Sequence, residues 1–487
     1  MLGAEKEPRA AARPSKAGDP KEMLAIYGKQ RANRWKVAGT TVRERADKLR
    51  RLRDGILARR KEIQEAIHAD FRKHPAEVDV TEIYPAIAEI NHMIRHLSKW
   101  MKPTRVGSPL PLFGTRGEIR YEAKGLVLIL SPWNYPFQLL INPLAAAIAA
   151  GNCVMLKPSS KVPNTSRFLK NFIAQLFDES EVALFEGSSA VSDALLELKF
   201  DHVFFTGSPS VGKKIMASAA KHLTPVTLEL GGKSPVIVDE TADVARAAER
   251  IVWGKYINAG QTCVAPDYLL IHESAERGFI EAAKSVIESR YGKAEDERRG
   301  SADFCRMVSV DHGAGLRKVL DEAVRAGARV EIGGGSDEKE RYFAPTLLSG
   351  VTGASPIMKE EIFGPILPIV RYRTLDEAIR FVQEREKPLA FYVFSRKRAS
   401  VERMIRESTA GGTCVNSLII HLANPDLPFG GVGQSGMGSY HGRHGFLTFS
   451  HERSVLRQGW LDTVRLFYPP YTAGVRRMVD WVIRFLT

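Results

Sequence analysis

The chain has 487 residues, of which 44% are hydrophobic and 26% are charged. These values exclude a disordered chain, and the lack of an apolar run of about eighteen residues excludes a membrane-integral one. We expect a globular protein of two or three domains. The net charge of +14 lies mainly in the N-terminal region. We interpret that region as a solvated helix face, with attraction to an anionic surface as the weaker alternative. We expect no nucleic-acid partner, because aromatic residues are not interleaved with the charges.

The four cysteines lie far apart, without a CxxC pair or a histidine at zinc-finger spacing: Cys153, Cys263, Cys305 and Cys414. We therefore expect no metal site and no disulfide framework, and we expect a reducing, cytoplasmic compartment. Residues 1–22 are rich in Ala, Pro, Lys and Arg but lack the apolar core of a secretory signal. We interpret them as a disordered leader.

Residues 23–101 have long helical periodicity. The Pro- and Gly-rich segment that follows, residues 102–124, contains GEIRYEA, whose alternation predicts an exposed strand or hairpin that forms an arm. From Gly125 onward, short β-rich runs alternate with helical ones, which is typical of βαβ crossovers and a parallel sheet. The predicted fold class is therefore α/β, and we assign residues 23–229 to a Rossmann-like, nucleotide-binding domain.

A second α/β domain is predicted over residues 230–416, and it includes a helical segment from Asp243 to Gly260. Residues 417–460 are expected to return to the first domain. Residues 461–487 form a tail with apolar residues at helical spacing, namely Val475, Met478, Val479, Val482, Ile483 and Leu486. This amphipathic stripe predicts either a helix that lies in a membrane interface or one that packs on the protein itself or across a dimer.

The stretch GQTCVAPDY places Cys263 in a short polar turn, which we expect to be exposed, instead of in an apolar run. The cysteine could be a small buried side chain, a metal or disulfide partner, or a nucleophile. A nucleophile that attacks a carbonyl needs hydrogen-bond donors for the developing oxyanion, a base for a later water and an acceptor for the leaving electrons. The nucleophile hypothesis therefore depends on the neighbours that the rest of the chain supplies.

Two other segments offer such groups. Asn134 in SPWNYPF follows the apolar strand GLVLIL, and its amide could donate to an oxyanion at the sheet edge where open α/β folds build their sites. It could equally shape the turn. Glu229 in LELGGKSP is a carboxylate in an apolar strand, where burial would raise its pKa toward the range of a general base. The alternative is a structural carboxylate that accepts hydrogen bonds from backbone amides.

The stretch FTGSPSVGK is a strand-to-helix turn that contains Gly207 and Gly212, and its glycine spacing matches neither the GxGxxG fingerprint nor a Walker loop. A helix that starts at Ser208 or Ser210 would still attract a pyrophosphate through its free amides and dipole. Lys157 in MLKPSS ends another predicted strand, where its ammonium could hydrogen-bond ribose hydroxyls.

Seven motifs in order resemble the aldehyde dehydrogenase superfamily: SPWNYPF, LKPS, FFTGSPSVGK, LELGGKSP, GQTCVAPDY, EEIFGPILPI and PFGGVGQSGMGSYHG. The forms APDY, EEIFGPILPI and SGMGSYHG are similar to its class 3 branch, which includes fatty aldehyde dehydrogenases. The resemblance implies NAD(P)-dependent oxidation of aldehydes to carboxylic acids, with medium- or long-chain aliphatic or aromatic substrates. It also implies a homodimer in which the arm and part of 417–460 serve oligomerisation, and it makes 230–416 the catalytic domain.

The resemblance further implies that Cys263 attacks the aldehyde to give a thiohemiacetal, whose oxyanion is held by Asn134 and the Cys263 amide. After hydride transfer to nicotinamide, Glu229 activates the water that hydrolyses the thioester. Glu361 of EEIFGP orients the nicotinamide ribose and is a second candidate base. The remaining cofactor contacts implied along the adenosine ribose, the pyrophosphate path and the nicotinamide ring are Lys157, Ser160, Gly207, Ser208, Gly212 and Phe363.

One residue departs from the pattern, since this chain has KPSS where the class commonly has KPSE. Ser160 thus replaces a carboxylate, which removes repulsion toward a 2′-phosphate, and Lys161 beside it could attract one. We therefore expect NAD or NADP as cofactor. The competing functions are a thiol hydrolase without redox chemistry, a CoA-acylating enzyme and a non-catalytic protein on the same scaffold, and the presence of Glu229 favours water as the acyl acceptor.

Overall fold

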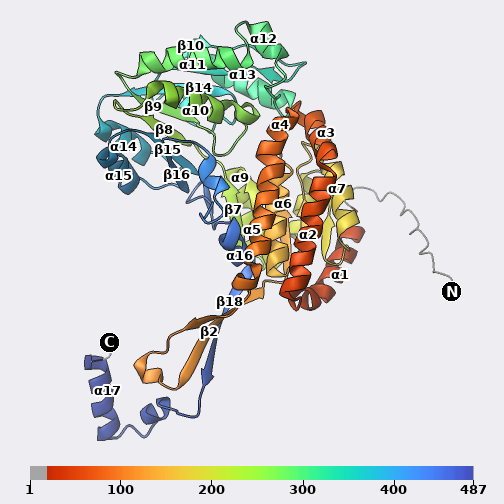
Figure 1. Cartoon of the computed structure of the whole chain (residues 1–487), viewed down its shortest axis with the longest axis vertical. Coiled ribbons are helices and arrows are strands. Elements are labelled where there is room, and N and C mark those ends of the chain that lie inside the picture. Colours follow the sequence, from red (N-terminus) through yellow and green to blue (C-terminus); the bar gives the residue numbers. More distant parts are fainter. Residues whose placement is uncertain (1–18, 486–487) are drawn as a thin grey trace, which may run out of the picture.

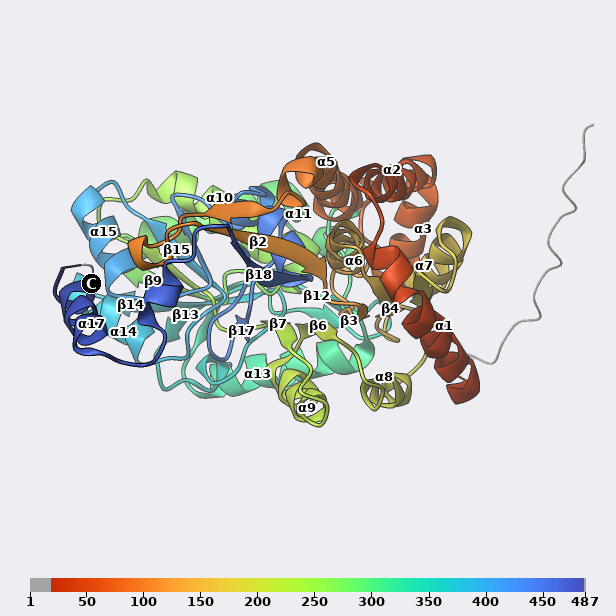
Figure 2. The ribbon, with the colours of Figure 1, turned by 90° about the horizontal axis from the view of Figure 1, so that it is seen from below.

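The structure, a computed structural model, describes residues 19–485 (Figure 1). Residues 1–18, which make up most of the predicted leader, and residues 486–487 lie outside the described part. A helical layer and a first sheet lie side by side, a second sheet with its helices packs at one end, and a long arm projects from the other end (Figures 1 and 2). Helix α1 begins at Pro20, inside the range predicted for the leader.

The helical prediction for residues 23–101 is confirmed. Asp19 caps α1 by accepting a hydrogen bond from the Lys21 amide, and a reciprocal capping box between Thr41 and Glu44 starts α2. Apolar side chains spaced along α2, such as Leu49 and Leu52, are fully buried against the first sheet's helices. The segment contains α1 (Pro20–Ala38), α2 (Val42–Ala58), α3 (Arg60–Phe71), α4 (Pro75–Val78), the π-helical turn η1 (Asp79–Ile83) and α5 (Tyr84–Trp100).

The first sheet has the strand order β17-β7-β6-β3-β4-β5 within the described residues. All pairs are parallel except the short edge strand β17, which runs antiparallel to β7. The strands are β3 (Leu126–Leu130), β4 (Cys153–Lys157), β5 (Val182–Leu184), β6 (His202–Gly207), β7 (Val226–Leu230) and β17 (Gly436–Met437). The accompanying helices are α6 (Gln138–Ala150), α7 (Pro163–Leu176), α8 (Ser189–Leu196), α9 (Pro209–Ala220) and α16 (Gly442–Thr448). The strands are mostly apolar because both faces of the sheet are covered.

The second sheet has the order β10-β13-β14-β9-β8-β15-β16, again parallel apart from the edge strand β10. Its strands are β8 (Pro235–Val238), β9 (Tyr268–His272), β10 (Arg329–Ile332), β13 (Thr346–Val351), β14 (Ile366–Tyr372), β15 (Ala390–Phe394) and β16 (Gly412–Val415), and a small hairpin joins β11 (Ser336–Asp337) to β12 (Tyr342–Phe343). The helices are α10 (Val244–Tyr256), α11 (Glu276–Tyr291), α12 (Glu295–Gly300), α13 (Val310–Arg325), α14 (Leu375–Gln383) and α15 (Arg398–Arg406). Short 3₁₀ turns are η3 (Ile257–Gly260), η4 (Pro356–Met358) and η5 (Ile420–Ala423). The predicted α/β class is confirmed.

The arm is a three-stranded antiparallel sheet that extends away from the body (Figure 1). The predicted hairpin is present, since β1 (Thr104–Val106) pairs with β2 (Thr115–Ala123) across the turn η2 (Leu110–Leu112). Strand β18 (Ser450–Gln458) pairs with β2 over its full length and forms one edge of the sheet, with β1 at the other. Two segments more than 300 residues apart therefore make the arm together.

The tail contains η6 (Val464–Phe467) and helix α17 (Ala473–Phe485), which lies beside the arm tip (Figure 1). No residue of α17 that the structure describes is buried. Of the predicted apolar stripe, Val475, Met478, Val479 and Val482 are half-buried and Ile483 is exposed, while Leu486 lies outside the described residues. The helix therefore does not pack into the protein's own core.

Candidate active site

The turn that carries Cys263 is buried, which corrects the expectation of an exposed turn. Gly260, Gln261, Thr262 and Val264 are all buried, and only Cys263 is half-buried. The backbone before it is left-handed at three successive residues, Asn258 (φ 52°), Ala259 (φ 49°) and Gly260 (φ 74°). A Cβ on Gly260 would meet the Gly364 carbonyl oxygen at 2.3 Å, so only glycine permits this approach. Polar residues in this turn serve internal hydrogen bonds and not contact with solvent.

Side-chain amides hold the turn in place. The Asn258 Nδ2 donates to the Asn134 carbonyl oxygen (2.9 Å) and to the Gln261 carbonyl oxygen (3.0 Å). The Gln261 Nε2 donates to the Asn258 carbonyl (3.0 Å), and its Oε1 accepts from the Val308 amide (2.9 Å). Because these bonds are buried, they fix the direction of the Cys263 side chain and join it to the segment of Asn134.

Cys263 lines a cavity of about 260 Å³ whose other walls are mostly apolar and come from four separate parts of the chain. These walls include Tyr84, Leu139, Trp253, Ile419, Leu422, Phe429 and Tyr440. Phe429 and Tyr440 lie in the motif PFGGVGQSGMGSYHG, whereas the other walls are ordinary apolar residues outside every motif that only the fold brings together. The thiol thus faces a space that suits an apolar substrate.

Two carboxyl groups influence the pKa of the Cys263 thiol. Burial, followed by the carboxyls of Glu361 and Glu229, raises the pKa of the Cys263 thiol to about 12, while the amides of Cys263 and Val264 oppose the shift. The structure therefore brings together three of the four predicted catalytic residues. Thiolate formation in this setting requires that a proton leave together with, or ahead of, attack on a carbonyl.

Glu229 is 3% exposed, and neither of its carboxyl oxygens has a hydrogen-bond partner among residues 19–485. Burial raises the pKa of this carboxyl well above its usual value. The residue lies on β7 opposite Gly436 of β17, as its apolar surroundings in the sequence predicted. The alternative of a carboxylate satisfied by backbone amides does not fit these unpartnered oxygens.

Hydrogen bonds hold the backbone on both sides of Glu361. The Lys233 ammonium donates to Asp267 and to the Glu360 carbonyl (2.8 Å), and Asp267 Oδ1 accepts from the Ile362 amide (2.9 Å). A Cβ on Gly231 would lie 2.0 Å from Glu361 Oε2, so the carboxyl rests on the glycine pair after β7. Burial, and next Asp267, raise the pKa of Glu361 to about 8.

Asn134 is buried four residues after β3 ends, at the expected edge of the first sheet. Its neighbour Tyr135 exchanges a 2.6 Å hydrogen bond with the Thr262 hydroxyl, which ties this segment to the residue before Cys263. Asn134 and Cys263 are thus on two connected segments, and the role of Asn134 as an oxyanion donor stays a prediction.

Aromatic side chains pack around Phe363. Its ring lies 5.3 Å from that of Trp133, and the His312 Nε2 is 2.9 Å from the Phe363 carbonyl oxygen. His312 was missed in the sequence because it stands in no motif. The Lys161 ammonium lies 5.7 Å from the Trp133 ring centre, so in this structure it is directed to that ring.

The other predicted cofactor residues follow the first sheet. Lys157 is buried at the end of β4, and burial lowers the pKa of its ammonium; Ser160 is exposed three residues later. Gly207 ends β6, and Ser208 is the N-cap of α9. A Cβ on Gly212 would lie 2.9 Å from the Leu230 side chain, so this glycine allows α9 to pack closely on β7. Its contact with a cofactor stays a prediction.

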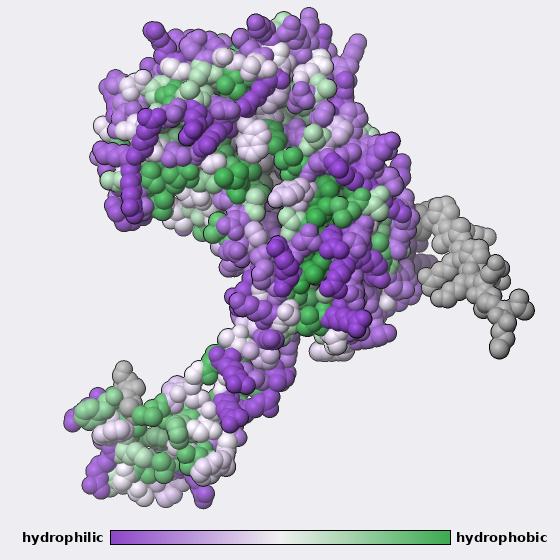
Figure 3. All heavy atoms as spheres, in the orientation of Figure 1, coloured by the Kyte–Doolittle hydropathy of each residue, from purple (hydrophilic) through white to green (hydrophobic). Residues whose placement is uncertain are grey.

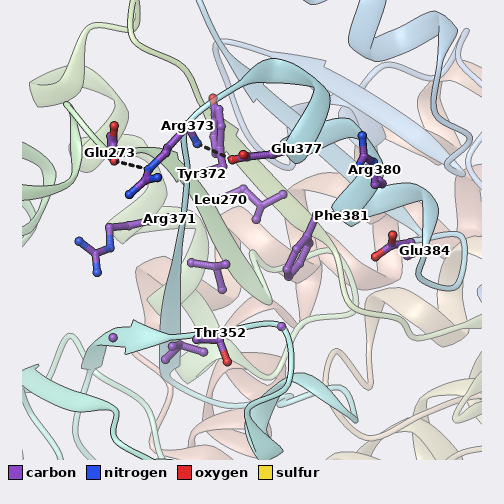
Figure 4. Close-up of a pocket in the computed structure, with 14 residues that line it drawn as sticks. Leu270, Glu273, Thr352, Arg371, Tyr372, Arg373, Glu377, Arg380, Phe381 and Glu384 are labelled. Carbon is purple, nitrogen blue, oxygen red and sulfur yellow. Dashed lines mark hydrogen bonds and ion pairs between the residues drawn. The ribbon is translucent and has the colours of Figure 1, made fainter.

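A larger cavity, of about 610 Å³, lies between β13, β14, β9 and α14 and contains none of the predicted residues (Figure 4). Three of its charged residues interact, since Arg373 pairs with Glu273 (3.1 Å) and its amide donates to Glu377 (2.8 Å). Without a nucleophile, this cavity does not compete with the one at Cys263.

Across residues 19–485, no helix is long and apolar enough to cross a bilayer, and no three acidic, histidine or cysteine side chains are grouped as a metal site would need. The four cysteines, all within that range, are free thiols.

Comparison with known proteins shows the family of the chain. The aldehyde dehydrogenase family model matches residues 12–455. The 4,4'-diaponeurosporen-aldehyde dehydrogenase of Staphylococcus aureus is 46% identical over 427 residues, which are 88% of this chain and 92% of that protein. Aldehyde dehydrogenase family 3 member B1 of Homo sapiens is 45% identical over 86% of this chain and 88% of its own length.

Among solved structures, the substrate-bound state of Staphylococcus aureus AldH has a TM-score of 0.90 and 43% identity, and covers 94% of this chain and 99% of that one. The relatives from family 3 confirm the expected likeness to the class 3 branch. The chain belongs to the aldehyde dehydrogenase family.

Proposed function

We propose that the protein oxidises medium- or long-chain aliphatic or aromatic aldehydes to carboxylic acids with NAD or NADP, through a thiohemiacetal and a thioester on Cys263. The observation that carries the proposal is the half-buried thiol on an apolar cavity, with the carboxyls of Glu229 and Glu361 acting on its sulfur. In this proposal residues 23–229 with 417–460 bind the cofactor and residues 230–416 carry the nucleophile.

The residues present fit a dinucleotide. Glu229 leaves two buried oxygens unpartnered in the part of the chain described, and Gly231 provides space that a Cβ would fill against Glu361. Lys157 and Ser160 would hold the adenosine ribose, Gly207 and Ser208 the pyrophosphate, and Glu361 and Phe363 the nicotinamide riboside. When bound, nicotinamide supplies the acceptor for the hydride that leaves the substrate carbon.

The protein's own groups would act in sequence. The Cys263 sulfur forms a bond to the aldehyde carbon while its proton passes to a neighbouring carboxyl, and the carbonyl π pair moves to oxygen. Asn134 and the Cys263 amide would donate to that oxygen. Once the carbon has lost hydride, a thioester remains on Cys263. Glu229 then takes a proton from water, the hydroxide adds to the thioester carbon, and the thiolate leaves as the carboxylic acid is released.

The substrate range is proposed from the cavity. Its walls near Cys263 are apolar, with Trp253, Leu139 and Phe429 among them, so they favour an alkyl chain or an aromatic ring over a charged substrate. The Staphylococcus aureus relative is named for 4,4'-diaponeurosporen-aldehyde, which supports an aldehyde as the substrate here.

Initial rates of reduced nicotinamide formation test the proposal, with straight-chain aldehydes of increasing length and benzaldehyde. We expect kcat/KM to rise with chain length, because each added methylene buried in the cavity contributes about 0.8 kcal/mol. Absence of cofactor reduction with every aldehyde, together with hydrolysis of an ester, would favour the thiol hydrolase instead.

We also propose that the protein is cytoplasmic, is a homodimer through its arm and touches membranes at the arm tip. Exposed apolar side chains gather there, in a cluster formed by Leu110, Phe113, Trp460, Leu466, Trp481 and Phe485 (Figure 3). Trp460 is 95% exposed, and the exposed cations Arg465, Arg476 and Arg484 flank the cluster. Such a composition suits the interface of an anionic bilayer.

The dimer rests on a second observation, because β18 is an edge strand of the arm and leaves one edge unpaired among the described residues. Flotation with vesicles of anionic or neutral lipid, using the full chain and a chain that ends at Tyr471, separates the two contacts. We expect only the full chain to float with anionic vesicles. Equal recovery of both chains, with dissociation of the shortened dimer in sedimentation, would assign the cluster to the partner subunit.

A further inference from the structure

Asn142 is a buried polar residue that the proposed reaction does not use. It lies in the middle of α6, whose sequence QLLINPLAAAIAA is otherwise almost entirely apolar, and it is 1% exposed. Neither its Oδ1 nor its Nδ2 has a hydrogen-bond partner within residues 19–485, yet the residue lines the same cavity as Cys263. An unmatched donor and an unmatched acceptor therefore lie in the wall of the substrate space.

Two other buried asparagines, Asn152 and Asn258, have hydrogen-bonded side chains, and Asn142 differs from both. Asn152, just after the same helix, donates through Nδ2 to the carbonyl oxygens of Ala147 (3.1 Å) and Phe449 (2.9 Å) and accepts from the Gly125 amide (2.8 Å). Asn258 donates to two carbonyl oxygens. Leaving a buried amide unmatched is unfavourable, and leucine or alanine would suit α6 better. A ligand group that pairs with the amide would remove this penalty.

The position of Asn142 tells where that group would be. The Leu139 amide donates to the Tyr135 carbonyl (3.0 Å), so helical geometry starts near Tyr135, whose hydroxyl bonds Thr262 beside Cys263. Asn142 follows seven residues later, which at 1.5 Å per residue is roughly 10 Å along the helix axis. A substrate whose carbonyl carbon sits at Cys263 would thus meet Asn142 with a distant part of its chain.

We propose that Asn142 selects aldehydes that carry a hydroxyl group on the chain, several carbons away from the carbonyl. A hydroxyl both donates and accepts, so it can pair with either atom of the amide, whereas an alkyl chain leaves both unmatched. The apolar walls around it, including Leu139 and Leu422, keep water out and strengthen that hydrogen bond. The inference rests on the proposed aldehyde oxidation and adds a substrate class to it.

Turnover of positional isomers tests the selection. The full-length enzyme is assayed with decanal and with hydroxydecanals whose hydroxyl is moved stepwise along the chain. We expect one isomer, or two adjacent ones, to exceed decanal in kcat/KM by tenfold or more, since a site built for a hydroxyl discriminates against the analogue that lacks it. In Asn142→Leu this preference falls to less than twofold, and kcat/KM for decanal rises.

Two variants keep the test decisive. Leu139→Met, on the same wall, serves as the matched control and should change all substrates by a similar factor. Asn142→Gln keeps the amide on a longer side chain, and it should retain a preference but move it to a different isomer, even if Asn142→Leu does not fold. Unfolding is checked by circular dichroism.

A binding measurement separates this inference from the proposed reaction. In Cys263→Ala, titration with the same aldehydes is followed by tryptophan fluorescence, since Trp253 lines the cavity. We expect the preferred hydroxydecanal to bind at least tenfold more tightly than decanal, without any turnover. If decanal is oxidised but no isomer is preferred or bound more tightly, the role of Asn142 is wrong while the proposed function stands. If no aldehyde is oxidised by the wild type, the proposed function fails, and the binding titration alone decides on Asn142.

Discussion

Glu229→Gln should make the protein more stable and nearly inactive. Both carboxyl oxygens of Glu229 are buried without a partner in residues 19–485, and burial alone raises the pKa of the group. A buried charged group without a partner costs about 1–3 kcal/mol or more. The neutral amide avoids the cost of charge, but it cannot take a proton from water, so kcat should fall by about 10²–10⁴.

The pH dependence gives this prediction its sign. The folded-state pKa of Glu229 lies above the usual 4.5. The contribution of the protonated carboxyl to the free energy of unfolding is therefore fully present below pH 4.5 and is lost as the pH rises toward the folded-state pKa. The advantage of Glu229→Gln over the wild type should therefore grow as the pH rises above 4.5. With an unfolding entropy of about 2.1 cal/mol/K per residue, 487 residues give roughly 1 kcal/mol/K, so the midpoint should rise by about 1–3 °C.

Glu89 supplies the matched control, because it lines the same cavity but is paired. Burial opposes ionisation of Glu89, yet the His441 imidazole (3.3 Å) and the Gly442 amide (2.7 Å) outweigh it and lower the pKa. The ionised Glu89 carboxylate stabilises the folded protein above pH 4.5, its usual pKa, and this contribution is lost as the pH falls below that value. Glu89→Gln should therefore lower the melting midpoint at pH 8. Calorimetry across pH measures both variants. A Glu229→Gln protein that melts below the wild type at pH 8, or keeps full turnover, would refute the reasoning.

Three further changes have defined outcomes. Gly231→Ala places a Cβ 2.0 Å from Glu361 Oε2, so the carboxyl must move, and steady-state kinetics should show kcat/KM lower by about 10²; wild-type rates would contradict the contact. Asn258→Ala removes two buried hydrogen bonds from the cysteine turn and should cost about 2 kcal/mol in denaturant unfolding and slow turnover, and an unchanged rate would show that the turn does not need them. Ser160→Glu should shift initial rates at equal subsaturating cofactor toward NAD by about tenfold (about 1.4 kcal/mol) relative to a wild type that uses both, whereas a hundredfold NAD preference in the wild type would defeat the argument.

Local pattern was enough for the elements and for the motif residues. The apolar runs around Glu229 and before Asn134 predicted buried strands. Glu229 lies within the buried strand β7, and Asn134 follows the end of the buried strand β3. The helical region and the βαβ alternation were likewise predicted, since periodicity and capping are local properties of a sequence. Cys263 was predicted to stand at a turn, and it does.

Features that depend on contacts between distant segments could not be predicted. The polar residues of the cysteine turn indicated exposure. However, the side chains of Gln261 and Asn258 form hydrogen bonds within the protein, to each other's segment and to the backbone of Val308 and Asn134. The turn can therefore be buried. His312 and most of the cavity walls, such as Leu139 and Trp253, belong to no motif. The third strand of the arm comes from the other end of the chain, where nothing in its own sequence names its partner.

The most direct test of the account is the identity of the atom that becomes acylated. Enzyme mixed with decanal and NAD is quenched in acid within one turnover, digested and analysed by mass spectrometry. We predict a decanoyl group on the peptide that contains Cys263, in larger amount in Glu229→Gln and absent from Cys263→Ala, which should also have lost aldehyde oxidation. A decanoyl group on Cys153, Cys305 or Cys414, or undiminished oxidation by Cys263→Ala, would contradict the account.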